Sequence, residues 1–461
     1  MRLVPTLLIT CVLPSCIVGE DGIAVGSNAY MPHGSPNGAG AADTVSSTGS
    51  IDTTNPFFQS LGTNGRACAS CHQQAEGWSI TPAGVKARFD ASDGLDPIFR
   101  TNDGSNRPDA DISTAQARKA AFSMLRSRGV IRVGLPIPAG AEFTLDAVDD
   151  PYGYANAGDL SLFRRPLPST NLRFLSTLMW DGRESKLDTP GDAHTFNLGA
   201  GLLQQSNDAT LGHAQATSTD TSQMASIVAF ETGLSTAQIS DSIGGPLDSE
   251  TAGGPVAIAG QTFFIGINDP LGQNPNKTAF DPRAFTLFDA WAPPATEKND
   301  PKRQRQYAIN RGQEIFNTRP IAITGVRGLN DVLGAPTIAG TCTTCHDTPN
   351  IGNHSISIAL DLGLTDEGRR TSDMPLYTLR NTSTGALVKT TDPGRALITG
   401  KWADIGKFKG AILRALSARP PYFHNGSAAT LADVVAFYNG RFGMNLSLQE
   451  TTDLVAFLSA L

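Results

Sequence analysis

The sequence has 461 residues, of which 17% are charged, and its formal net charge at pH 7 is −7. This length is enough for two or three domains, and the acidic balance argues against nucleic acid as a partner. Charged residues fall below the roughly 25% of ordinary globular chains, whereas the 47 Gly and 29 Pro residues indicate a loop-rich protein.

The N-terminus has the features of an export signal. Met1-Arg2 is a short positive start, and residues 3–13 form an apolar stretch that is too short to span a bilayer. Residues 13–16, Leu-Pro-Ser-Cys, resemble a bacterial lipobox, in which Cys16 is acylated and becomes the first residue of the mature protein. Ordinary signal cleavage somewhat later is the alternative. Either route predicts a location in the periplasm or cell envelope, with a lipid anchor to the outer membrane in the lipobox case.

The next segment, 17–49, is poor in large apolar residues. Such a composition cannot bury enough apolar surface to offset the entropy of ordering. We therefore expect a flexible tether between the signal peptide at 1–16 and the first folded domain.

Two pentapeptides carry the strongest chemical signal, Cys68-Ala-Ser-Cys71-His72 and Cys342-Thr-Thr-Cys345-His346. Each is a C-x-x-C-H run, the pattern that attaches a c-type haem. The two thiols bond to the haem vinyl groups, and the histidine that follows binds the iron. A zinc ribbon needs further Cys and His pairs, and a thioredoxin-like site does not need the histidine. The sequence therefore predicts two covalently attached haem c groups, with His72 and His346 as iron ligands.

The two haem motifs divide the rest of the chain into two predicted domains. Residues 50–297 are expected to form an N-terminal haem domain, and residues 298–461 a C-terminal one. Within the first, the stretches 101–115 and 206–280 are rich in Gly, Ser, Thr, Asn and Asp and are predicted to be long surface insertions.

Helical patterns are clearest near the C-terminus. Residues 302–317 place their apolar side chains on one face and predict a helix. A second helix is predicted to begin at Thr430 and to stop near Gly440, and a third begins at Ser447. Four residues of the second helix share one apolar face: Leu431, Val434, Val435 and Tyr438.

Two further motifs lie far apart in the chain. Residues 179–183 read Met-Trp-Asp-Gly-Arg, and residues 421–427 read Pro-Tyr-Phe-His-Asn-Gly-Ser, preceded by Leu413-Arg414. Together with the C-x-x-C-H runs, they resemble the bacterial dihaem cytochrome c peroxidases and their relative MauG. The resemblance implies a mainly α fold of two cytochrome c-like haem domains that face each other, here with long loop insertions. It also implies that the N-terminal haem reacts with hydrogen peroxide while the C-terminal haem transfers electrons.

The resemblance also implies how each iron is capped. Many of these peroxidases cap the N-terminal haem with a histidine, but none occurs here between His72 and His194. We therefore expect an open sixth position, as in MauG, unless His194 or His213 reaches the iron. At the C-terminal haem, Tyr438 stands where the peroxidases have a Met ligand and MauG has Tyr. The alternative ligand is Met444, and the choice matters because axial ligands control haem potential.

Four residues are implied to carry the chemistry. Trp180 matches the family residue that relays electrons between the haems, although a packed core Trp is the alternative. The family also has a Gln followed ten residues later by a Glu that moves protons. Aligning the Gln with Gln205 puts Gln215 at the Glu position, where an amide shuttles protons poorly. His213 is the candidate replacement because an imidazole exchanges protons near neutral pH, and an ordinary loop histidine is the alternative.

The remaining expectations concern anions and calcium. Arg414 and His424 are implied to hydrogen-bond the propionates of the C-terminal haem. Calcium is left open, because Arg165 replaces a family ligand and a guanidinium cannot bind Ca²⁺, although it can hydrogen-bond carbonyls in the same space. The Asp-rich stretch 103–111 lacks EF-hand spacing and is expected to be a solvated loop.

Three functions remain open. The favoured one is a peroxidase or oxidase that uses hydrogen peroxide, with electrons from a small redox protein or from a residue on a protein substrate. The second is a dihaem electron-transfer protein, in which Gln215 marks lost catalysis. The third is a haem oxygenase that acts on an organic substrate with O₂, with the loop insertions as a lid.

Overall fold

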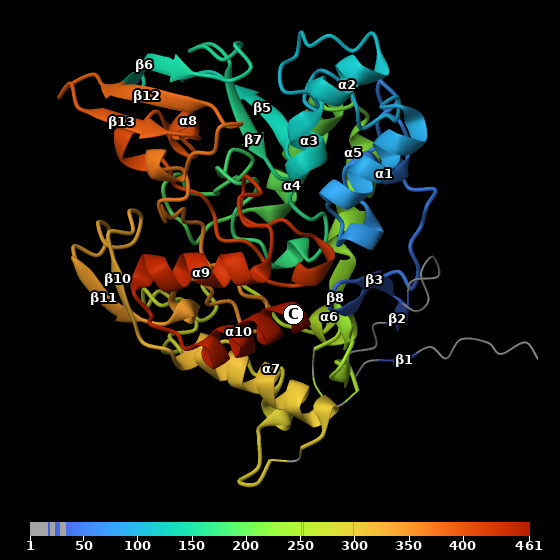
Figure 1. The fold of residues 1–461 in the computed structure, drawn as a ribbon, viewed down its shortest axis with the longest axis vertical. Coiled ribbons are helices and arrows are strands. Elements are labelled where there is room, and N and C mark those ends of the chain that lie inside the picture. The colour runs from blue at the N-terminus through green and yellow to red at the C-terminus, as the bar shows by residue number, and fades with distance from the viewer. Residues whose placement is uncertain (1–16, 19–23, 28–33, 250, 252, 298) are drawn as a thin grey trace, which may run out of the picture.

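The computed structural model describes residues 17–18, 24–27, 34–249, 251, 253–297 and 299–461 (Figure 1). The predicted signal peptide, with Cys16, lies outside this part of the chain. Within it, no helix combines the length and hydropathy needed to cross a membrane.

Helices and short strands alternate along the chain. The helices are α1 (Pro82–Ser92), α2 (Ala115–Ala121), α3 (Ser123–Arg128), α4 (Leu198–Gly212), α5 (Thr221–Thr232), α6 (Pro255–Ala259), α7 (Pro301–Thr318), α8 (Ala396–Thr399), α9 (Leu431–Phe442) and α10 (Leu448–Ala460). The strands are β1 (Ile17–Val18), β2 (Ala24–Ser27), β3 (Ser35–Asn37), β4 (Gly40–Ser46), β5 (Ile131–Leu135), β6 (Phe143–Asp149), β7 (Leu160–Arg164), β8 (Leu234–Asp241), β9 (Gly245–Pro246), β10 (Ile321–Thr324), β11 (Thr337–Gly340), β12 (Leu376–Asn381) and β13 (Leu387–Thr390).

Helices α7, α9 and α10 pack around one hydrophobic core. α10 contacts both α7 and α9, and the three lie stacked in the lower half of Figure 1. As predicted, Thr430 and Ser447 begin α9 and α10 through capping boxes. The predicted stop at Gly440 is wrong, because α9 continues to Phe442 and ends at Gly443. Gly443 has a φ of +58°, the left-handed backbone that favours glycine just after a helix.

A small antiparallel sheet joins the two halves of the chain. β12 pairs with β13 on one side and with β6 on the other. Beneath these strands, Phe143, Tyr377 and Leu379 share one buried cluster. The sheet therefore crosses the boundary predicted between residues 297 and 298, and the two predicted domains share a core.

Part of the predicted flexible tether, 17–49, is a strand in a sheet. β4 pairs with β8 along its whole length, and Ala42 and Val45 are buried. The scarcity of large apolar residues suggested a tether, but here small side chains let β4 pack closely against β8. At Gly40 the two strands are so close that an added Cβ would lie 2.1 Å from the Ser240 carbonyl oxygen. The partner strand lies far away in the sequence, so no local pattern indicates the pairing.

The second predicted insertion, 206–280, is also more regular than expected. It contains the end of α4, all of α5 and α6, and the strands β8 and β9. Polar residues that suggested a loop instead cap helices, as Asp220 does by accepting hydrogen bonds from the backbone of Ser222 and Gln223. The other insertion, 101–115, is mostly irregular, but Asp103 and Asn106 are buried. The expectation of a solvated loop at 103–111 is therefore wrong for its first residues.

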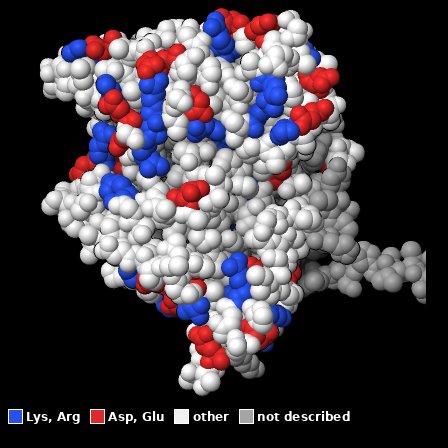
Figure 2. Space-filling model, in the orientation of Figure 1, with Lys and Arg blue, Asp and Glu red and all other residues white. Residues whose placement is uncertain are grey.

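Charged side chains are mixed on the visible surface. Figure 2 shows Lys and Arg interspersed with Asp and Glu, mostly in the upper and lower parts of this face. Neither sign forms a continuous patch there.

Candidate haem sites

The two C-x-x-C-H motifs fold into the same tight turn. In the first, the amides of Cys71 and His72 both donate to the Cys68 carbonyl, each at 3.1 Å. In the second, Cys345 and His346 donate to the Cys342 carbonyl at 3.3 and 3.1 Å. All four cysteines are free thiols. Each turn therefore presents two thiols and a histidine together, as covalent haem attachment requires.

Both histidines are prepared to bind a metal through Nε2. The Nδ1 atom of His72 lies 3.0 Å from the Trp78 carbonyl, and that of His346 is hydrogen-bonded to the Gly352 carbonyl. A carbonyl only accepts, so Nδ1 carries the hydrogen and Nε2 keeps a free lone pair. Burial lowers the pKa of His72 to about 4 and also lowers that of His346. Both imidazoles are therefore neutral at pH 7, the form that ligates iron.

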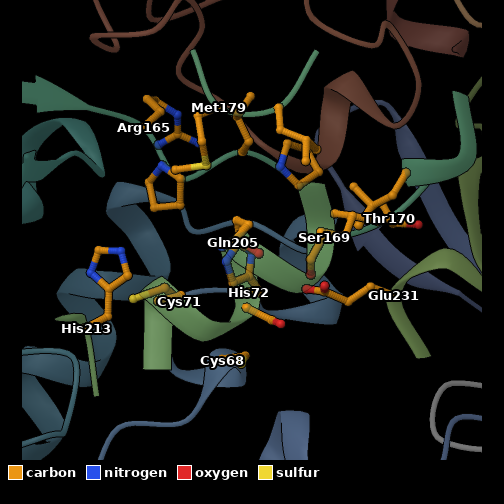
Figure 3. Close-up of a pocket in the computed structure, with 18 of the residues that line it drawn as sticks. Cys68, Cys71, His72, Arg165, Ser169, Thr170, Met179, Gln205, His213 and Glu231 are labelled. Carbon is orange, nitrogen blue, oxygen red and sulfur yellow. The ribbon is translucent and has the colours of Figure 1, made fainter. Parts of the chain in front are cut away.

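A cavity of about 180 Å³ lies beside the first motif (Figure 3). Its wall combines the haem-motif turn, α4, α5 and the segment that follows β7. Several predicted site residues meet there: Cys68, Cys71, His72, Trp180, Gln205, His213 and Arg414. Gln215 is exposed and does not line the cavity, so the structure does not support its predicted place at the site.

A second cavity, of about 210 Å³, lies beside the second motif. It is lined by the predicted residues Cys342, Cys345, His346, His424 and Tyr438, and by Met444. Arg414, which we expected at this haem, lines the first cavity instead. The four apolar-face residues of α9 all line this second cavity, so the predicted face is confirmed.

Tyr438 and Met444 are both placed to reach the second cavity. The ring of Tyr438 stacks on Phe442 at 6.2 Å, and its hydroxyl makes no hydrogen bond among the described residues. Burial raises the pKa of this phenol. Met444 is buried just beyond the end of α9. Cavity shape therefore does not distinguish the two predicted ligands.

Trp180 belongs to the wall that separates the two cavities. It lines both of them, and its indole N–H donates to the Arg165 carbonyl at 2.8 Å. Its ring centroid lies 6.3 Å from that of His424, in an edge-on arrangement. The next residue, Asp181, is fully buried and paired with Arg164. The Met-Trp-Asp-Gly-Arg motif thus places an oxidisable ring in the wall of both cavities.

Buried cations without carboxylate partners surround the same wall. Arg165, Lys409 and Arg419 line both cavities, and Arg414 lines the first. None of the four forms an ion pair with a described residue. Burial lowers the pKa of Lys409 to about 7, those of Arg165 and Arg414 to about 9, and that of Arg419 to about 10.

These cations provide a test of whether haem fits. Burying an unpaired charge is costly, and the Nε atoms of Arg414 and Arg419 also lack hydrogen-bond partners, as do both ring nitrogens of His424. Haem carries two propionates, which supply the missing negative charge and hydrogen-bond acceptors. The donor sets of both cavities therefore fit covalently attached haem.

His213 is held at the first cavity by Asp103, a buried carboxylate that is itself paired with Arg66. Its Nδ1–H donates to the carboxylate of Asp103, which also pairs with Arg66. Burial disfavours the charged carboxylate, but Arg66 and His213 outweigh this effect and lower the pKa of Asp103. Asp103 is 6% exposed, whereas the side chain of His213 is 43% exposed. Sequence reasoning missed Asp103 because it was assigned to a solvated loop.

A second missed residue is Glu231, on α5. It lines the first cavity, is 6% exposed, and has no hydrogen bond or ion pair to its carboxylate among the described residues. No motif marks it in the sequence.

The side chain of Arg165 hydrogen-bonds backbone carbonyls, as the sequence analysis allowed. Its guanidinium donates to the carbonyls of Gly129, Ile80 and Arg419 at 3.1, 2.7 and 3.1 Å. In the part of the chain that the structure describes, no cluster of three or more His, Cys, Asp or Glu side chains is arranged to hold a metal ion. His194 lies away from the first cavity, hydrogen-bonded to Asp192.

Comparison with known proteins gives several partial matches. No family model matches the sequence. The chain is 34% identical over 139 residues to a cytochrome-c peroxidase of Denitromonas iodatirespirans, covering 26% of this chain and 36% of that protein. It is 30% identical over 122 residues to the cytochrome c551 peroxidase of Nitrosomonas europaea, covering 26% and 30%. The matches thus span about a third of these relatives' length.

The solved structures that match include a crystal structure of a MauG-like protein associated with microbial copper homeostasis, with a TM-score of 0.38 and 15% sequence identity, over 88% of this chain and 86% of that one.

The repeated turns, the free thiols and the oriented histidines define a c-type haem protein. The curated matches relate about a quarter of the chain to cytochrome-c peroxidases at 34% identity, so the predicted resemblance to cytochrome c peroxidases is confirmed over that part.

Proposed function

We propose that this chain is an exported dihaem peroxidase or oxidase that reduces hydrogen peroxide at the N-terminal haem. Electrons reach that haem from the C-terminal haem through Trp180. The observation that carries the proposal is the position of Trp180 in the wall shared by two cavities, each with its own C-x-x-C-H histidine. The partial similarity to cytochrome-c peroxidases supports the reaction class.

The N-terminal haem, when bound, supplies the iron site at which peroxide is activated. Reduction of one hydrogen peroxide to two waters consumes two protons and two electrons, so the cavity must move protons. His213 holds a hydrogen on Nδ1 toward Asp103, which leaves Nε2 free to exchange a proton. The Gln205 amide lines the same cavity and can donate a hydrogen bond to bound peroxide.

The electrons come from a one-electron donor outside the chain. A small redox protein is the simplest donor, and an oxidisable residue on a protein substrate is the alternative. The proposed location is the periplasm or cell envelope, because the N-terminal sequence resembles an export signal.

A peroxide titration of the purified oxidised holoprotein tests the function. We expect rapid changes in the absorption of both haems with stoichiometric peroxide, followed by peroxide-dependent oxidation of a reduced small cytochrome. A protein whose haems do not respond to peroxide would instead be an electron-transfer module. Oxygen uptake with an organic substrate, without added peroxide, would indicate an oxygenase.

Replacing Trp180 by Phe tests the relay. Phe fills most of the space but is much harder to oxidise, so peroxide should still react at the N-terminal haem while the response of the C-terminal haem slows. Stopped-flow absorption at two wavelengths separates the two events. Trp402→Phe is the matched control, because Trp402 packs in a separate cluster outside both cavities. Equal slowing in both variants, or none in Trp180→Phe, contradicts the relay.

Two variants decide the ligand of the C-terminal haem. If Tyr438 is the ligand, Tyr438→Phe changes the EPR spectrum of that haem and raises its reduction potential, because an anionic phenolate stabilises ferric iron. Met444→Leu then leaves both unchanged. The opposite pattern assigns Met444 as the ligand. Because the two side chains line the same cavity, each variant is the control for the other.

A further inference from the structure

Glu231 is a buried carboxyl group for which the proposed reaction has no role so far. It projects from the last turn of α5 into the wall of the first cavity. The electrostatic partner found for it among the described residues is the Cys68 thiol, which becomes a thioether when haem is attached. No charged side chain in the described part of the chain compensates the Glu231 carboxylate.

Its surroundings keep this carboxyl neutral. Burial raises the pKa of Glu231 from its ordinary value of 4.5 to about 8. The same helix carries Ile227, one turn before Glu231, and Phe230, next to it in sequence, and both belong to a buried apolar cluster. At pH 7 the group is therefore mostly a carboxylic acid, which can donate a proton.

Glu231 and His213 lie on opposite sides of the cavity. In Figure 3, His213 is at the left beside Cys71, and Glu231 is at the right below Ser169. The Ser169 hydroxyl lines the same cavity, is buried, and has no hydrogen-bond partner. One side of the cavity thus carries the partly exposed His213, which is hydrogen-bonded to Asp103. The other side carries the buried Glu231 carboxyl and the Ser169 hydroxyl.

We propose that Glu231 is a second, internal proton donor to the first cavity, working opposite His213. This inference rests on the proposed peroxidase function. As the O–O bond of hydrogen peroxide breaks, the Glu231 carboxyl gives its proton to the departing oxygen, which leaves as water. The resulting carboxylate regains a proton from the solvent when the cycle ends. The other oxygen becomes a second water by taking up one proton by way of His213 and two electrons, delivered one at a time, from the external donor already proposed.

A purely structural role does not account for the residue. A lone buried carboxyl forfeits its hydration without gaining a hydrogen bond, so it costs folding free energy. Polar groups that destabilise a fold in this way are concentrated at functional sites. Gln has nearly the same shape as the protonated carboxyl but cannot give up a proton.

Glu231→Gln in the holoprotein separates these roles. We expect the initial peroxide reaction at pH 7 to slow by roughly 10²-fold, the lower end of the range for lost acid–base catalysis. Glu184→Gln is the matched control, because burial also raises the pKa of Glu184 although it lies outside the cavity. That variant should react as the natural protein does.

Infrared spectroscopy provides a readout that does not depend on activity. The difference spectrum between the natural protein and Glu231→Gln should contain a protonated carboxyl band at pH 7 that disappears with a midpoint near pH 8. Asp43, whose pKa burial raises to about 6, is present in both proteins and cancels in the difference.

Unfolding gives a third readout with a defined sign. Above pH 4.5 the unfolded chain ionises Glu231 while the folded protein does not, so the natural protein loses stability as pH rises to about 8. Glu231→Gln does not lose stability in this way. The difference in thermal midpoint between Glu231→Gln and the natural protein should therefore grow in favour of the variant from pH 4.5 to about 8 and then stay constant.

If the natural protein fails to react with peroxide, the proposed function is wrong. If it reacts and Glu231→Gln reacts equally fast, or no carboxyl band is found, this inference is wrong.

Discussion

Replacing Arg164 by Met is expected to lower the free energy of unfolding by about 3–5 kcal/mol, because buried Asp392 loses its cation and buried Asp181 keeps only the more exposed Arg183. Arg164 donates to Asp392 at 2.7 and 2.9 Å and to Asp181 at 2.5 Å. All three side chains are at most 2% exposed. Burial disfavours the charged form of Asp181, but Arg164 outweighs it and lowers the pKa of that carboxyl to about 2.

Chemical denaturation of the holoprotein at pH 7 measures this effect. Arg107→Met is the control, since Arg107 forms an exposed pair with Asp109, and it should cost no more than about 1 kcal/mol. Removing all three charges together, with Asn at Asp181 and Asp392, should cost less than Arg164→Met alone. A loss below about 1 kcal/mol in Arg164→Met would show that this triad does not stabilise the wall behind Trp180.

Replacing His213 by Ala is expected to slow the reaction with peroxide by about 10³-fold, within the range typical of a lost acid–base group. The imidazole lines the first cavity and is oriented by Asp103, which Arg66 holds in place. Stopped-flow mixing with peroxide measures the loss. His194→Ala is the control because His194 lies outside that cavity, and it should react normally.

Asp103→Asn tests whether orientation of His213 matters. An Asn amide can donate to Nδ1 and thereby shift the ring hydrogen to Nε2, the wrong form for accepting a proton. We expect Asp103→Asn to reproduce most of the loss and to alter the pH profile, with haem content unchanged. If the rate of the peroxide reaction falls only in proportion to the haem content of Asp103→Asn, the role of Asp103 is structural.

Features formed by residues close together in the sequence could be predicted from the sequence alone. A C-x-x-C-H run brings two thiols and a histidine together within one turn, and the histidine's hydrogen bond to a carbonyl six residues later is also local. Helix caps at Thr430 and Ser447 likewise depend on side chains three residues apart. Such features need no distant partner. Sequence reasoning predicted both helix caps correctly, whereas it made no prediction of the histidine–carbonyl hydrogen bonds.

The errors came from residues whose surroundings are set by distant segments. The strand β4 was assigned to a tether because its partner, β8, lies nearly two hundred residues later. Asp103 was assigned to a solvated loop because its partners Arg66 and His213 are far from it in sequence. Arg414 was expected at the C-terminal haem but lines the first cavity, a placement that also depends on segments distant in sequence.

The sequence by itself thus predicted covalent haem, the cysteines that attach it and the histidines that bind its iron. Only the tertiary structure decided what lines each cavity: Trp180 in the wall of both, a cluster of cations around it, and His213 opposite Glu231. The physical reason is that covalent attachment depends on neighbours along the chain. Burial, and with it charge state and proton affinity, depends on neighbours in space.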